Sequence, residues 1–288
     1  TSDSEPQPLD FNVPVTICKG AFDGFKTSIV VFREGSDPIL YGGAFDSNIK
    51  SAFFHAPVNI TECDTQKVFE AVENITLSID KLRGPYPYPS LNNVSDLADL
   101  SAGVTFDLSE IYQVVGVGTD TGSFQVGDSK LIVPSFLAAT YAETPVWNNF
   151  KGKIENSDES FLTDEAGVIY KTQIYGENNT GELYLVNGNA AKGDIVLPGR
   201  FDKEYPNLKP SIIMPSAFEG NDEITSVNIK FWSSWPHAFT NCSRLTSVKI
   251  EGLTGVEGLF AGTPVHTLDI ELYFECYNTE RGIAFDKT

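Results

Sequence analysis

Apolar and polar residues alternate in short runs through the first two thirds of the chain. The runs are rich in Val, Ile, Phe and Tyr, and clusters of Gly, Pro, Asn and Asp separate them. This pattern predicts β-strands joined by hairpin turns and loops. Two segments, 94–100 and 135–143, favour short helices instead. We expect strands at 11–18, 28–32, 67–79, 103–108, 111–118, 130–134, 167–176 and 181–188.

Many short strands with little helical periodicity are typical of a sandwich or a jelly roll. We therefore expect an all-β chain in which a polar N-terminal arm (1–10) precedes a β-sandwich-like or jelly-roll-like domain (11–190). The composition changes at NGNAAKGD (187–194), and we place a domain boundary there. The second domain then comprises residues 191–288.

One pattern of apolar residues occurs three times in this second domain. AFEGNDEITSVNI (217–229) and AFTNCSRLTSVKI (238–250) begin 21 residues apart, and LFAGTPVHTLDI (259–270) follows. A single copy cannot bury its own apolar face, but stacked copies can. The repetition therefore predicts a short solenoid. The positions in phase are Phe218, Phe239 and Phe260; Ile224, Leu245 and Val265; Val227, Val248 and Leu268; and Ile229, Ile250 and Ile270.

The segment AFTNCSRLTSVKI resembles the BspA-type leucine-rich repeat, whose pattern is approximately A-F-x-x-C-x-x-L-x-x-V-x-I. The similarity covers about residues 195–270, with IVLPGRF (195–201) as a degenerate first turn. The first copy departs from the pattern with Asp222 near the place of the cysteine, and the third is one residue shorter. The resemblance implies that Cys242 is a free thiol packed in the core. It also implies that the protein is secreted or lies at the cell surface, where proteins with such repeats often act in adhesion.

A weaker repetition lies near the N-terminus. GAFDGF (20–25) and GGAFDSNIKSAFF (42–54) place Ala-Phe pairs 23 residues apart. Because the apolar positions that follow do not keep register, we interpret these segments as strands of β-hairpins. Decayed repeats are the alternative interpretation.

Charge and modification motifs indicate where the protein works. A formal net charge of −19 excludes nucleic-acid backbones and anionic membrane surfaces as partners. No apolar run reaches the roughly 18 residues of a membrane span, and a start at Thr1 indicates that a leader has been removed. Five Asn-x-Ser/Thr triplets favour a secreted glycoprotein with N-linked glycans, and a bacterial surface protein with chance triplets is the alternative. The triplets start at Asn59, Asn74, Asn93, Asn178 and Asn241.

The four cysteines lack the C-x-x-C spacing of zinc and redox sites. The simplest disulfide pairing joins Cys18 to Cys63 and Cys242 to Cys276. The core position that the repeat resemblance implies for Cys242 is the competing interpretation, so both remain open.

Motifs of catalysis and cofactor binding are absent from the sequence. It contains no G-x-S-x-G, H-E-x-x-H or phosphate-binding loop, so we expect neither an enzyme nor a cofactor. The acidic segment NSDESFLTDE (156–165) favours a solvated loop over a Ca²⁺ site, because it lacks the glycine and spacing of an EF-hand. In FWSSW (231–235), the side chains of Phe231, Trp232 and Trp235 are suited to stack on a sugar or a partner. Covering the solenoid core is the alternative.

These observations together predict a non-enzymatic extracellular structural glycoprotein. A short solenoid has open ends. The strand-like segment YFECY (273–277) near the C-terminus is expected to form a cap strand, which would itself be an edge strand. Exposed edges pair with other edges, so we expect self-association into a homo-oligomer, a fibre or a surface layer. The alternative is a cell-surface adhesin or a carbohydrate- or protein-binding module that uses the repeat face.

Overall fold

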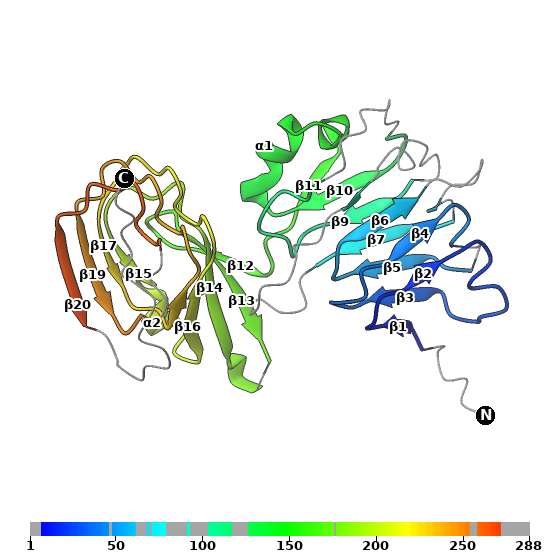
Figure 1. The fold of residues 1–288 in the computed structure, drawn as a ribbon, viewed down its shortest axis with the longest axis horizontal. Helices are drawn as coiled ribbons and strands as arrows, with labels where there is room; N and C mark the ends of the chain where they lie inside the picture. The colour runs from blue at the N-terminus through cyan, green and yellow to red at the C-terminus, as the bar shows by residue number, and fades with distance from the viewer. Residues whose placement is uncertain are drawn as a thin grey trace. The chain divides into compact units, whose positions relative to one another are not determined.

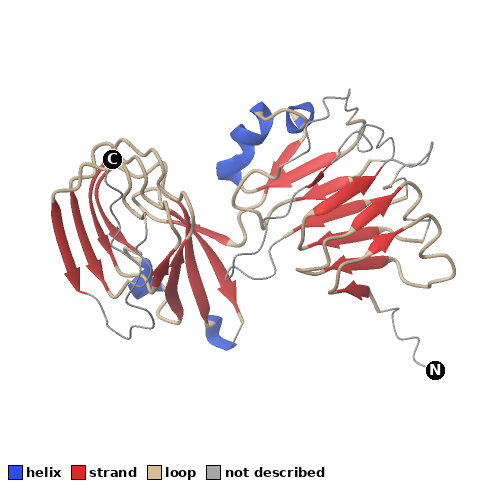
Figure 2. Ribbon diagram, in the orientation of Figure 1, coloured by secondary structure: helices blue, strands red, loops and turns tan. Residues whose placement is uncertain are grey.

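The computed structural model describes residues 7–45, 48–61, 68–69, 71–78, 91–92, 103–116, 126–175, 177–253 and 258–271. The chain divides into two compact units, unit 1 (Thr1–Glu159) and unit 2 (Ser160–Thr288). Both are built mostly from strands with few helices (Figures 1 and 2). The strands form β-solenoid turns, about nine in all. Within the described ranges no helix has both the length and the apolar character that crossing a membrane requires.

Unit 1 contains two parallel sheets whose strands alternate along the chain. The backbone therefore winds as a coil in which each of the first four turns gives one strand to each sheet. The larger sheet consists, in spatial order, of β1 (Leu9–Phe11), β3 (Ile29–Phe32), β5 (Ser51–Phe54), β7 (Asn74–Leu77), β9 (Thr105–Asp107), β10 (Lys130–Val133) and β11 (Ile154–Asn156). The smaller consists of β2 (Thr16–Ile17), β4 (Ile39–Tyr41), β6 (Val58–Thr61) and β8 (Leu91–Asn92).

Stacked aromatic rings run through the core of unit 1. Phe11, Phe32 and Phe54 stack on successive strands of the larger sheet, with ring centroids 5.3 and 5.0 Å apart. Parallel strands in register place equivalent side chains one above another, which produces such a ladder. The helix α1 (Ser135–Glu143) lies where the sequence predicts it, and η2 (Trp147–Phe150) follows. Tyr141 and Trp147 bury their rings in the same core.

The structure does not show the predicted sandwich or jelly roll in unit 1. Strands pair in parallel with the next turn of the coil, as Leu9 does with Val30 and Val30 with Ala52. The rings of Phe22 and Phe45 also stack, with centroids 5.6 Å apart. The Ala-Phe pairs therefore mark successive solenoid turns, and the decayed-repeat interpretation is the correct one.

Two features concealed this repeat in the sequence. Loops of different length separate each phenylalanine from its strand, so Val30 comes eight residues after Phe22 and Ala52 only seven after Phe45. Glycines at the corners of a coil also have the composition of hairpin turns. A further prediction was wrong: residues 111–116 of the expected strand 111–118 form no strand. The expected helix at 94–100 lies outside the described residues.

Unit 2 begins with an antiparallel hairpin and continues as a parallel solenoid. Its mixed sheet consists of β12 (Phe161–Thr163), β13 (Ile169–Ile174), β14 (Gly181–Asn187), β16 (Leu208–Ile213) and β18 (Ser233–Ser234). The second sheet, which we name the repeat sheet, is parallel and consists of β15 (Gly193–Leu197), β17 (Ile224–Ile229), β19 (Ser247–Glu251) and β20 (Thr267–Glu271). Figure 1 shows β20 at its outer edge. Two short helices, η3 (Glu177–Asn179) and α2 (Phe201–Glu204), lie in the connections.

The predicted solenoid at the end of the chain is confirmed. Val227 pairs with Val248 and Val248 with Leu268, as the repeat spacing requires. The three phenylalanines stack with centroids 4.6 and 5.4 Å apart. The predicted boundary near residue 190 lies inside unit 2, because β14 pairs with β16 across that position.

Candidate functional site

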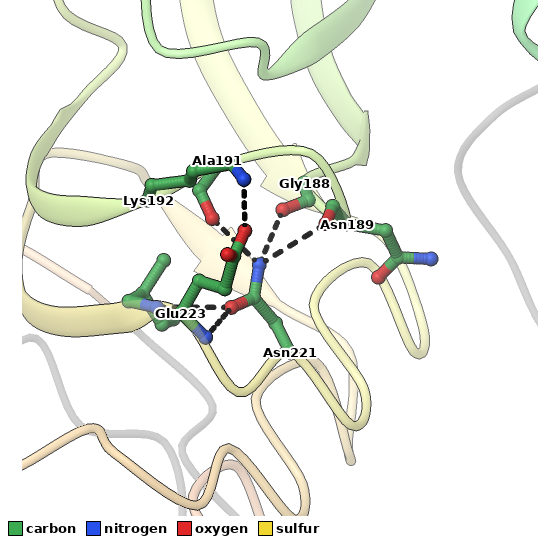
Figure 3. Close-up of polar contacts among 7 residues, drawn as sticks. Gly188, Asn189, Ala191, Lys192, Asn221 and Glu223 are labelled. Carbon is green, nitrogen blue, oxygen red and sulfur yellow. Dashed lines mark hydrogen bonds and ion pairs between the residues drawn. The ribbon is translucent and has the colours of Figure 1, made fainter.

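The turns before β17 and β19 each carry a buried residue whose side chain bonds to the neighbouring turn. In the first copy this residue is Asn221, which is buried. Its Nδ2 donates hydrogen bonds to the carbonyl oxygens of Gly188 at 2.9 Å and Ala191 at 3.0 Å, and its Oδ1 accepts from the backbone N–H groups of Glu223 and Ile224 (Figure 3). Each of these bonds satisfies a backbone group of a tight turn, so the role of Asn221 is structural.

Asn221, and not Asp222, therefore occupies the position equivalent to the repeat cysteine. The spacing of 21 residues between Asn221 and Cys242 is the sequence signal that identifies it. Around it, Lys192 and Glu223 form an ion pair at 2.5 Å that lies on the surface (Figure 3). Such exposed pairs contribute little to stability.

Cys242 is a buried thiol in the core, as the repeat resemblance implies. Its Sγ donates a hydrogen bond to the carbonyl oxygen of Phe218 at 3.0 Å, and burial raises the pKa of the thiol to about 12. A thiol that stays protonated is neither a nucleophile nor a metal ligand. Cys18 is exposed, and both are free cysteines. The predicted pairing with Cys63 and Cys276 is therefore not supported, and those two residues lie outside the described ones.

The structure separates the three residues of the predicted aromatic site at 231–235. The ring of Phe231 is buried in the core of unit 2, while Trp232 is 67% exposed. Trp235 is half-buried, and its backbone N–H donates to the carbonyl oxygen of Ile213. One residue thus fills the core, and one large aromatic surface faces solvent. Trp232 is the residue of this site that presents most of its surface to solvent.

The outward face of the repeat sheet is a second candidate surface, which sequence reasoning named only in general terms. Polar and charged side chains occupy most of it, and Val196 is exposed among them. Asp194 Oδ1 accepts hydrogen bonds from Thr225 Oγ1 at 2.8 Å and Ser226 Oγ at 2.7 Å, and these bonds lower the pKa of the Asp194 carboxyl. Glu251 forms ion pairs with Lys249 at 2.8 Å and Lys230 at 3.4 Å. We name this surface the polar face; its members are Asp194, Ser226, Asn228, Lys230, Ser247, Lys249, Glu251, Thr267 and Asp269.

The acidic segment 156–165 uses two of its carboxylates in local hydrogen bonds. Asp158 accepts from the backbone N–H of Ser135 at 2.7 Å. Asp164 accepts from two backbone N–H groups and from the hydroxyl of Tyr170, and its burial raises the pKa of the carboxyl. In the part of the chain that the structure describes, no group of three or more His, Cys, Asp or Glu residues is placed to hold a metal ion. The expected solvated loop is wrong at 161–164, where the strand β12 (Phe161–Thr163) and the buried Asp164 lie.

The predicted glycosylation sites differ in exposure. Asn74, Asn178 and Asn241 are exposed, and Asn178 sits in a turn with a positive φ of 58°. Asn59 is half-buried within β6, between β4 and β8. Asn93 lies outside the described residues. Three of the five positions therefore present their side chains to solvent on the folded chain.

Comparisons with known proteins identify no family for this chain. No protein-family model matches it, and no curated protein does. The BspA type of the repeat is therefore not confirmed. Among solved structures, the chain is similar to one described as the crystal structure of the pneumococcal vaccine antigen PcpA, with 10% identity and a TM-score of 0.28. The match covers 94% of this chain and 73% of that one. A likeness at this TM-score carries no argument about function.

Proposed function

We propose that this chain is a non-enzymatic extracellular structural protein that self-associates into a fibre or a surface layer. The observation that supports this most directly is the exposure of apolar residues in the last described turn of the solenoid. Leu268 and Ile270 occupy the same inward positions as Val248 and Ile250, yet they are 38% and 37% exposed, against 1% for each residue of the preceding strand. Solenoid units bury their apolar faces only against a neighbour, so this end favours a further layer.

The chemistry of the chain fits a role outside the cell. Net charge of −19 keeps such a repeat protein soluble before it assembles. The exposed glycosylation triplets are compatible with N-glycans that project away from the solenoid. The protonated, buried thiol of Cys242 and the structural hydrogen bonds of Asn221 and Asp164 favour a non-catalytic role for these three residues.

Sedimentation velocity of the purified chain over a wide concentration range tests the proposal. We expect species that grow in mass with concentration, and elongated or layered particles in electron micrographs. Digestion with an N-glycosidase, with intact mass measured before and after, tests the secretory route separately. A chain that remains monomeric at every concentration overturns the structural role.

The exposure of Trp232 favours a second candidate function, which is capture of a glycan or protein ligand. Indole faces stack on sugar rings and on cationic groups, and Lys230 of the polar face lies two residues away. Trp232→Ala should then abolish capture on a glycan array without lowering the melting temperature. Lys209→Ala, an exposed change on β16, is the matched control. Retained capture by the Trp232 variant rejects this function.

A further inference from the structure

The two units follow the same rules of construction, so a turn of one can stack on a turn of the other. In unit 1 a buried phenylalanine lies in the turn before β3, β5 and β7, and in unit 2 before β17, β19 and β20; both units stack these rings at similar spacing. The centroids are 5.6 and 5.5 Å apart for Phe22, Phe45 and Phe69, and 4.6 and 5.4 Å apart for Phe218, Phe239 and Phe260. The spacing between layers is thus compatible across units.

Two of the described edge strands, β20 of the repeat sheet and β1 of the larger sheet of unit 1, carry apolar inward residues that are incompletely buried. The predicted cap strand at 273–277 lies outside the described residues. At one end, β20 pairs with β19 and leaves Leu268 and Ile270 exposed. At the other, β1 pairs with β3. Its inward residues Leu9 and Phe11 are only half-buried, although their partners on β3 are fully buried. Each end therefore has apolar inward side chains and a row of backbone groups on its outer edge.

The sequences of these two strands match. β1 contains Leu-Asp-Phe (9–11), and β20 contains Leu-Asp-Ile (268–270). In both, the first and third residues point inward and the aspartate points outward, as the register with β3 and β19 shows. A parallel pairing of Leu9 with Leu268 and of Phe11 with Ile270 keeps every apolar residue on the core side. A shift by one residue would move them all to the solvent face.

The opposite end of the unit 2 solenoid is closed. Ile195 and Leu197 on its first strand, β15, are buried in a core that includes Val168 and Tyr170 of the hairpin β12–β13. The exposed end of β20 therefore has no equivalent apolar acceptor on β15. In unit 1 the strand β11 is also an edge of the larger sheet, but its register places the polar Asn156 opposite the buried Val133. The edge strand with two apolar inward residues to match those of β20 is therefore β1.

We infer that β1 of a second copy of this chain pairs in parallel with β20 and continues the solenoid across the contact. The pairing rests on the proposed self-association, and the two surfaces that meet are the outer edges of β20 and β1. The contact is heterologous, because different patches meet, so it repeats without closing and produces a filament. Asp269 then approaches Asp10 of the next copy. The guanidinium of Arg33, bonded to Asp10 at 3.1 Å, partly balances these charges. Salt, which screens the remaining repulsion, should strengthen association.

Two variants of the full chain, each blocked at one end, test this pairing. Ile270→Glu places a charge on the β20 end, and Leu9→Glu places one on the β1 end. Both positions are already partly exposed, so we expect folded chains with unchanged circular dichroism and melting temperature. Val196→Glu is the charge-matched control, because Val196 is exposed on the outward side of β15, at the opposite edge of the repeat sheet from β20.

Sedimentation velocity is then run on each chain and on an equimolar mixture of the two blocked chains. We expect the unchanged chain and Val196→Glu to polymerise, each blocked chain alone to remain monomeric, and the mixture to form a dimer of one chain of each kind and nothing larger. Dimers of Leu9→Glu alone would mean that two β20 strands pair with each other, which overturns the inference. Polymers of both blocked chains would place the contact elsewhere and also overturn it, while leaving the proposed self-association intact. An unchanged chain that stays monomeric overturns both.

Discussion

Replacing Gly188 with alanine tests whether the stacked phenylalanines fix the packing of unit 2. A Cβ atom at Gly188 would lie well under 3.0 Å from the Cδ1, Cε1 and Cζ atoms of the Phe218 ring. Carbon atoms pack at about 3.5–4.0 Å, so the ring must move by more than about 1 Å. The backbone hydrogen bonds of Gly188 to Ala217 and of Phe218 to Ala238 show that these turns are consecutive layers. The ring is therefore pushed toward Phe239, on which it already stacks at 4.6 Å.

The expected cost of this change follows from overpacking. Extra carbon atoms in a well-packed core usually cost about 1–3 kcal/mol, and a fully buried ring with a neighbour on its far side places Gly188→Ala near the upper limit. The measurement is the free energy of unfolding from urea denaturation followed by circular dichroism. Gly116→Ala is the control, because a Cβ there meets nothing within 4 Å and its φ is not positive.

A double mutant separates the steric cause from any other. In a Phe218→Ala background the added methyl group meets no ring, so the further cost of Gly188→Ala should fall below about 1 kcal/mol. A loss of less than about 0.5 kcal/mol for Gly188→Ala in the unchanged chain would refute the reasoning, because surface changes without structural consequence have effects of that size. An equal cost in both backgrounds would also refute it.

Three further changes probe single contacts. Asn221→Ala removes the buried donor that bonds to Gly188 and Ala191, and urea denaturation should show a loss of about 2–4 kcal/mol; a loss below about 1 kcal/mol would contradict the role given to this residue. In peptide mapping after brief treatment with a thiol reagent, Cys18 should be modified and Cys242 should not until the chain unfolds; early modification of Cys242 would show that its turn opens. Burial raises the pKa of Asp164 in the folded chain, so its contribution to stability is fully present below the ordinary pKa of 3.8 and declines as pH rises through the raised value. The difference in unfolding free energy between the unchanged chain and Asp164→Asn should then shrink with rising pH. A difference that grows with rising pH would mean that folding lowers the pKa of Asp164, which contradicts the prediction.

The sequence was sufficient for the solenoid of unit 2 because its copies have nearly equal length. Phe218, Phe239 and Phe260 keep constant spacing, and the apolar positions that follow remain in phase with them. The short helix at Ser135–Glu143 was also expected from the sequence, since the segment contains three alanines and one leucine, which favour helices.

Unit 1 was misinterpreted for a physical reason. Alternation of apolar and polar residues identifies a strand with one buried face, but it does not identify the partner strand or its direction. The inward residues of successive turns in unit 1 are unevenly spaced along the chain. Ile75 comes 23 residues after its partner Ala52, but the next inward residue, Phe106, comes 31 residues after Ile75. Where the loops vary, the layers remain regular in space while the repeat disappears from the sequence.

The candidate surfaces could be predicted only in part. Phe231, Trp232 and Trp235 are equally apolar in sequence, and the turn from β17 to β18 decides which of them faces solvent. Asn221 is a common polar residue that belongs to no recognisable motif. The carbonyl oxygens to which its side chain donates lie at least 30 residues away in the sequence, so its role could not be predicted from the residues around it. Long-range contacts of this kind follow from the winding of the coil.

Sedimentation velocity on the equimolar mixture of Leu9→Glu and Ile270→Glu tests the central claim most directly. End-to-end assembly through β1 and β20 predicts a dimer that contains one chain of each variant, formed from two chains that are monomeric when alone. A mixture in which both chains remain monomeric, while the unchanged chain polymerises, would contradict it.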